Sequence, residues 1–140
     1  MKTIIAVLIL ALAGCTGRKG LPVRYVVPDG YRGVLSVTFD ASAGSPVVVT
    51  NGEYVITFPE SGQLAVSSLD FLRGEHTIRA EWANGETLSI GSPMGDGAQE
   101  VAFRFVYYQR NAKTAVCVVG TEDEASAAFS MDPGTLRESE

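Results

Sequence analysis

From residue 23 onwards, apolar and polar residues alternate along most of the chain, and this period of two constrains the fold more than any other feature. In the segment 34–40, for example, Leu35, Val37 and Phe39 occupy alternate positions. Successive side chains of a β-strand point to opposite faces of a sheet, so this alternation is typical of a strand with one buried face. The pattern therefore predicts an all-β protein made of short strands.

Turn sequences divide the chain into segments of strand length. Asn-Gly pairs at 51–52 and 84–85 are strong hairpin signals, and the first predicts a tight type I′ turn. Residues 59–62, with the sequence Pro-Glu-Ser-Gly, predict a further reversal. The expected strands are Val23–Val27, Val34–Asp40, Pro46–Thr50, Glu53–Phe58, Gln63–Ser68, His76–Ala83, Glu86–Ile90, Glu100–Gln109 and Lys113–Val119.

The longest of these segments, 100–109, is rich in aromatic residues. Strict alternation would place Val101, Phe103, Phe105 and Tyr107 on one face of the strand. We therefore expect these four side chains to contribute to a single apolar layer.

The C-terminal part of the chain predicts a central strand followed by a helix. Lys113–Val119 is an unbroken, mainly apolar run, which is typical of a strand buried on both faces. Thr121 and Glu124 form a capping-box pattern that predicts a helix of about two turns, ending near Phe129. Together these patterns predict an antiparallel β-sandwich with one short C-terminal helix, and a partly open barrel is the alternative.

The N-terminus has the layout of a secretory signal. Lys2 is followed by the apolar run 4–13, which is shorter than the roughly 20 residues that a membrane-spanning helix needs. At the end of this run, Leu12, Ala13, Gly14 and Cys15 resemble the lipobox of bacterial lipoproteins. The resemblance implies cleavage before Cys15 and attachment of a diacylglyceryl group to its thiol. The alternatives are an ordinary cleaved signal and an N-terminal strand of a cytosolic protein.

This reading divides the chain into four parts. Residues 1–14 are the expected signal peptide, 15–22 the lipidated N-terminus with a short tether, 23–130 a single β-rich domain, and 131–140 a flexible tail. The expected location is the bacterial cell envelope, with the membrane bound through the lipid anchor. Because residue 16 is Thr and not the Asp that the lipoprotein pattern associates with inner-membrane retention, the outer membrane is favoured if the host is Gram-negative.

Three segments resemble a family of uncharacterised bacterial lipoproteins with a β-rich domain. They are Pro28–Gly33, with the pattern Pro-x-Gly-Tyr-x-Gly, Pro59–Gly62, with Pro-x-Ser-Gly, and Val119–Glu122, with Val-Gly-Thr-Glu. The stretch 72–82 does not follow this pattern. The resemblance implies a secreted β domain and brings no assigned activity. More distantly, the layout is similar to transthyretin-like sandwiches.

The inventory of reactive residues argues against an enzyme. The chain has a single histidine, His76, so histidine-based metal clusters and a serine-type catalytic triad with additional histidines are disfavoured. Cys117 lies among β-branched residues and is expected to be a small buried hydrophobe. The acidic run 122–124 fits a helix N-terminus better than a calcium site. We therefore expect no catalytic residues, no metal and no cofactor.

The formal net charge of −5 argues against nucleic acid as a partner, because phosphate recognition requires a basic face. Tyr31 and Tyr108 are the best candidates for an exposed aromatic face that contacts a ligand or partner, expected to be an envelope protein or a glycan. The sequence thus favours a non-enzymatic binding or envelope-structural module. The alternative is an inhibitor or immunity protein that blocks a secreted hydrolase or toxin, with the loop 91–97 or the turn 59–62 as the inserting element.

Overall fold

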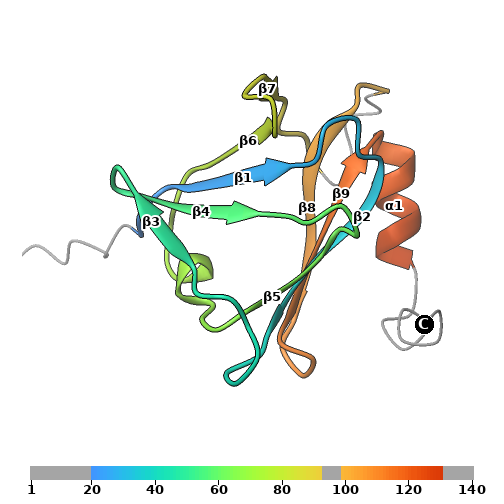
Figure 1. The fold of residues 1–140 in the computed structure, drawn as a ribbon. Helices are drawn as coiled ribbons and strands as arrows, with labels where there is room; N and C mark the ends of the chain where they lie inside the picture. The colour runs from blue at the N-terminus through green and yellow to red at the C-terminus, as the bar shows by residue number, and fades with distance from the viewer. Residues whose placement is uncertain (1–19, 93–98, 131–140) are drawn as a thin grey trace, which may run out of the picture.

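The structure of the protein is a computed structural model that describes residues 20–92 and 99–130, and it consists of two β-sheets and one α-helix (Figure 1). The five-stranded sheet has the order β3-β4-β1-β6-β7, and the four-stranded sheet the order β5-β2-β9-β8. The strands of the first sheet are β3 (Val48–Thr50), β4 (Glu53–Thr57), β1 (Val23–Val27), β6 (Ile78–Trp82) and β7 (Thr87–Leu88). Those of the second are β5 (Gln63–Val66), β2 (Gly33–Phe39), β9 (Thr114–Gly120) and β8 (Ala102–Gln109). A 3-10 turn, η1 (Asp70–Leu72), follows β5, and the helix α1 (Glu122–Ser130) follows β9.

The predicted all-β, sandwich-like class with one short C-terminal helix is confirmed. The expectation that all strands pair antiparallel is wrong, because both sheets are mixed. Strand β1 lies between β4 and β6 and runs parallel to both, while β2 runs parallel to β5. The hairpins β3–β4 and β6–β7 flank the N-terminal strand, so antiparallel pairing holds within each hairpin and parallel pairing joins the hairpins to β1.

Both Asn-Gly pairs lie in hairpins, but the two turns differ. Asn51 and Gly52 both have positive φ values, 52° and 77°, and Thr50 pairs directly with Glu53, as the predicted type I′ turn requires. In the second hairpin the amide of Gly85 donates to the Trp82 carbonyl at 2.9 Å. There only the glycine has a positive φ, 90°, which fits a three-residue loop ending in a left-handed residue.

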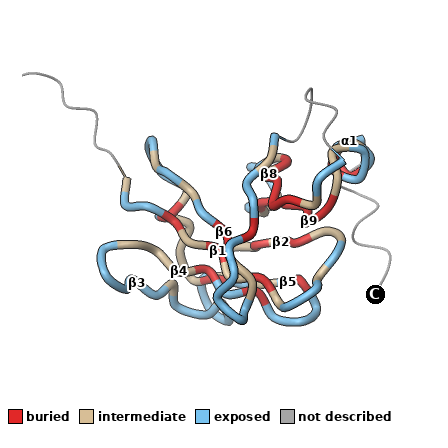
Figure 2. Tube along the Cα trace, turned by 90° about the horizontal axis from the view of Figure 1, so that it is seen from above, coloured by how far each residue is buried: buried red, intermediate tan, exposed pale blue. Residues whose placement is uncertain are grey.

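Strand β9 is central, as predicted, and is buried on both faces. On one face it meets the five-stranded sheet, and on the other it is covered by α1 (Figures 1 and 2). The helix packs Ala125 and Ala128 against Val118 of β9 and Val106 of β8. The molecule therefore has a third layer over part of the four-stranded sheet.

The predicted capping box is present at the start of α1. The Thr121 amide donates to Oε2 of Glu124 at 2.7 Å, and the Glu124 amide approaches Oγ1 of Thr121 at 3.4 Å. Glu124 also pairs with Arg32, whose Nη2 lies 2.9 Å from its carboxylate. The cap therefore joins the helix to the loop that precedes β2.

The main core lies between the sheets, where the buried residues concentrate (Figure 2). The ring of Tyr25 on β1 stacks on that of Phe103 on β8, with centroids 4.6 Å apart. Cys117 is buried in this core, as expected, and burial raises the pKa of its thiol far above the ordinary value. The thiol therefore packs in the core as a small apolar group.

The predicted single face of the long strand is wrong at Tyr107, because β8 contains a bulge. Phe105 pairs with Cys117 and Tyr107 with Val116, so Val106 is an additional residue in β8. The bulge turns Tyr107 to the helix side, where it packs beside Val106. It also brings the next residue, Tyr108, to the same side of the strand as Phe105.

Candidate binding site between the sheets

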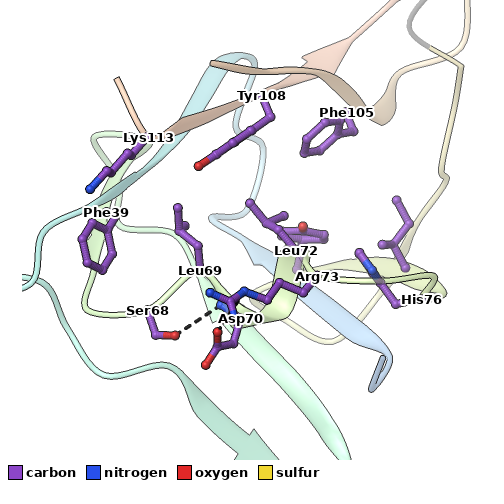
Figure 3. A pocket seen from close by; sticks show the side chains of 12 residues that line it. Phe39, Ser68, Leu69, Asp70, Leu72, Arg73, His76, Phe105, Tyr108 and Lys113 are labelled. Atoms are coloured by element: carbon purple, nitrogen blue, oxygen red, sulfur yellow. Dashed lines mark hydrogen bonds and ion pairs between the residues drawn. The ribbon is translucent and has the colours of Figure 1, made fainter. Parts of the chain in front are cut away.

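At one end of the sandwich, the two sheets leave a hollow of about 830 Å³, which we call the inter-sheet hollow (Figure 3). Its walls come from β1 and β6 of one sheet, from β2 and β8 of the other, and from the segment around η1 between them. The lining side chains are Tyr25, Phe39, Ser68, Leu69, Asp70, Leu72, Arg73, His76, Ile78, Phe105, Tyr108 and Lys113.

The lining of the hollow is mainly apolar. Tyr25 and Phe105 face it from opposite sheets, and the η1 turn supplies Leu69 and Leu72. This turn is held by the Leu72 amide, which donates to the Leu69 carbonyl at 3.0 Å, and by the buried ring of Phe71 beneath it. The apolar walls therefore rest on well-packed elements.

Charged side chains lie at the rim. Nε of Arg73 is 3.3 Å from Oδ1 of Asp70, and both side chains are largely exposed. Lys113 lies on the opposite side, with Nζ 5.0 Å from the centroid of the Phe39 ring, within the range of a cation–π contact. Figure 3 shows Lys113 and Arg73 on two sides of the hollow. An apolar cavity with a polar rim is typical of a site for a small molecule.

The sole histidine of the chain, His76, lines the hollow. Nδ1 of His76 lies 3.0 Å from the carbonyl oxygen of Gly74, two residues earlier in the same loop. Within the described residues, no group of three His, Cys, Asp or Glu side chains could hold a metal ion.

The two tyrosines predicted to form an exposed face lie in separate hollows. Tyr108 is 39% exposed and lines the inter-sheet hollow beside Phe105. Tyr31 is half-buried and lines a different hollow near Phe58. They therefore do not form one aromatic patch, and only Tyr108 belongs to the candidate site.

Tyr31 also connects two turns of the chain. Its hydroxyl donates to the Val34 carbonyl at 2.5 Å and lies so close to Gly62 that a Cβ there would come within 2.1 Å of the hydroxyl oxygen. Gly62 has a positive φ of 74° as well, so glycine is required at this position on two grounds. Two segments of the lipoprotein-like pattern, 28–33 and 59–62, therefore meet through this contact.

Arg104 is a buried charge that the alternation pattern did not reveal. Its side chain is 1% exposed, and the guanidinium donates to the carbonyls of Gly120 and Glu100 at 3.1 Å each and to that of Ser92. The carbonyls of Ser92 and Gly120 lie 12 and 16 residues from Arg104, so no local signal could identify their part in holding it. The arrangement joins β8, β9 and the connection after β7.

The outer face of the five-stranded sheet carries a network of ion pairs. Arg24 reaches Glu81 at 2.8 Å and Glu53 at 3.1 Å, and Arg79 reaches Glu53 at 2.6 Å. The hydrogen bond from Arg79, together with the nearby positive charges, holds the pKa of Glu53 below its usual range. Because these charges pair with one another, we assign this face a structural role.

Several predicted features lie outside the described residues. These are the signal peptide 1–14 with Leu12, Ala13 and Gly14, the lipidation site Cys15, most of the tether, most of the loop 91–97, and the tail 131–140. The helices in the described part of the chain are too short or too polar to span a bilayer.

No protein-family model and no curated protein matches the chain. Among solved structures, the fold is similar to that of a Bacillus anthracis protein whose crystal structure carries a provisional description as a lipoprotein. The sequences are 17% identical, the match covers 82% of each chain, and the TM-score is 0.47. This distant likeness assigns neither a family nor a function.

Proposed function

We propose that the protein is a lipid-anchored, non-enzymatic binding module of the bacterial cell envelope, and that the inter-sheet hollow is its binding site. The observation that carries the proposal is the hollow itself, with its volume of about 830 Å³ and its mainly apolar lining. Small-molecule sites usually span roughly 300–1,000 Å³ and have apolar walls with a few polar groups. The lipobox-like segment ending at Cys15 supports the anchor.

The character of the lining favours an apolar ligand over a glycan. A glycan presents many hydroxyl groups, and each would lose hydrogen bonds to water unless the site replaced them. Leu69, Leu72, Ile78 and Phe105 supply no such partners. The charged groups of the lining, those of Asp70, Arg73 and Lys113, lie at its rim.

Binding can be tested with the neutral, apolar fluorophore N-phenyl-1-naphthylamine and the chain from position 15 onward, with alanine in place of Cys15. We expect saturable fluorescence enhancement. Leu72→Glu should abolish it, because the carboxylate would have to be desolvated in the hollow. The matched control is Val48→Glu, which adds the same charge at a position that is 57% exposed on the edge strand β3. Equal binding by both variants would refute the assignment of the hollow.

The anchor can be tested separately by feeding an alkyne-bearing palmitate to cells that express the full chain. The protein should be labelled, and Cys15→Ala should abolish the label while Cys117→Ala retains it. Labelling that persists in Cys15→Ala would contradict the proposed anchor.

A further inference from the structure

The described chain enters the domain at the mouth of the inter-sheet hollow. The Gly20 amide donates to the Glu75 carbonyl at 2.8 Å, and a Cβ on Gly20 would lie 2.9 Å from the Arg73 carbonyl and 3.5 Å from the His76 Cβ. Arg73 and His76 both line the hollow. The N-terminal entry point is therefore adjacent to the rim.

This placement limits how far the rim could lie from a lipid attached at Cys15. Cys15 and Gly20 are five positions apart, and even a fully extended segment of this length spans only about 17 Å. A lipid-anchored domain would thus hold the rim of the hollow close to the lipid headgroups.

The charges at the rim suit an anionic headgroup. Among the lining residues that the structure describes, Arg73 and Lys113 carry positive charges and Asp70 the negative charge. Because Asp70 pairs with Arg73, the lining has a net excess of one positive charge, whereas the chain as a whole has a net charge of −5. Cations near a membrane surface are attracted to anionic lipids.

We propose that the inter-sheet hollow receives an acyl chain of an anionic phospholipid from the membrane to which the protein is anchored. The acyl chain lies against Leu69, Leu72 and Phe105, and the headgroup lies between Lys113 and Arg73. This proposal rests on the proposed lipid anchor and deepens the proposed binding function by assigning the class of ligand and its source.

The test uses the full-length lipidated protein in nanodiscs that contain either phosphatidylglycerol or phosphatidylcholine with a photoactivatable acyl chain. After irradiation, we expect crosslinks within 68–78 and 105–113, several-fold more with phosphatidylglycerol. Lys113→Glu should remove this preference. The matched control Arg110→Glu changes the same charge on the same hairpin, at an exposed residue outside the lining, and should retain it.

The outcomes separate this inference from the proposal on which it rests. Two results would overturn the inference if mass spectrometry shows a lipid on Cys15: equal crosslinking of the two phospholipids, or crosslinks only outside these segments. Neither result would contradict the anchor. A parallel sample receives free photoactivatable palmitate in place of the photoactivatable phospholipid. Crosslinking to the free palmitate but to neither phospholipid would overturn the membrane phospholipid as the source of the acyl chain. Absence of a lipid on Cys15 by mass spectrometry would overturn the anchor, and the inference with it.

Discussion

At the scale of single residues, two tyrosine hydroxyls offer a direct comparison. The Tyr107 hydroxyl is buried without a hydrogen-bond partner in the described part of the chain, whereas the Tyr31 hydroxyl donates to Val34. Tyr107→Phe should leave the free energy of unfolding unchanged or raise it by up to about 1 kcal/mol, while Tyr31→Phe should lower it by about 1 kcal/mol. Urea unfolding measures both. A larger loss from Tyr107→Phe than from Tyr31→Phe would contradict this assignment.

The buried thiol gives a second prediction at this scale. Cys117→Ser places a hydroxyl in the apolar core and should lower the free energy of unfolding by about 1–3 kcal/mol. The Cys117 thiol is buried, and burial raises its pKa, so it should also resist thiol-specific reagents at pH 8 until the protein unfolds. The rate of thiol labelling is measured in the Cys15→Ala variant, in which Cys117 is the remaining cysteine. Rapid reaction of the folded protein would show that Cys117 is accessible.

At the scale of elements, the cap of α1 should make stability depend on pH. The hydrogen bond from the Thr121 amide, and then the contact with Arg32, lower the pKa of Glu124. A carboxyl with a lowered folded-state pKa contributes stability above its unfolded value, about 4.3, and loses it as the pH falls through the folded value. The contribution should therefore be present at pH 7 and diminish below about pH 4.

Glu124→Gln tests this linkage. The variant should be less stable than the wild type at pH 7, and the difference should shrink by pH 3, as measured by urea unfolding at both values. Asp123→Asn removes the same charge from the same turn without touching the cap, so it serves as the control. A difference for Glu124→Gln that does not change with pH would disprove the role of its charge.

The elements that local chemistry determines were predictable, and those that distant partners determine were not. Gly52 allows the positive φ of the first hairpin turn, and Thr121 caps the helix that follows it. Both effects involve residues close in sequence, so the first hairpin and the start of the helix could be predicted. The parallel partners of β1 lie dozens of residues further along the chain, and no turn signal specifies them. The alternating residue pattern of β8 continues past Val106 in the sequence, although the bulge interrupts the alternation of its side chains between the two faces. The face on which Tyr107 lies could therefore be seen only in the structure.

The candidate site also contains some residues that could be predicted from the sequence and others that could not. Tyr108 was predicted to be an exposed aromatic side chain, and it is 39% exposed and lines the hollow, because the bulge places it on the same side of β8 as Phe105. Whether it contacts a ligand stays a prediction. Leu72 and Lys113, by contrast, come from segments that meet only when both sheets are formed. The proposed function depends on these residues lying around one hollow. The alternation of apolar and polar residues within single strands does not predict that arrangement.

At the scale of the whole molecule, the shared core predicts that the two sheets unfold together. Tyr25 of the five-stranded sheet stacks on Phe103 of the four-stranded sheet, so neither sheet keeps its apolar face buried without the other. Trp82, the sole tryptophan, reports on the first sheet by fluorescence, and Cys117 reports on the second by thiol labelling in the Cys15→Ala background. Both probes should give the same urea midpoint, as expected for a cooperative domain of this size. If Trp82 fluorescence changed at clearly lower urea than Cys117 labelling, the sheets would be separate units, and the inter-sheet hollow would open before the domain unfolds.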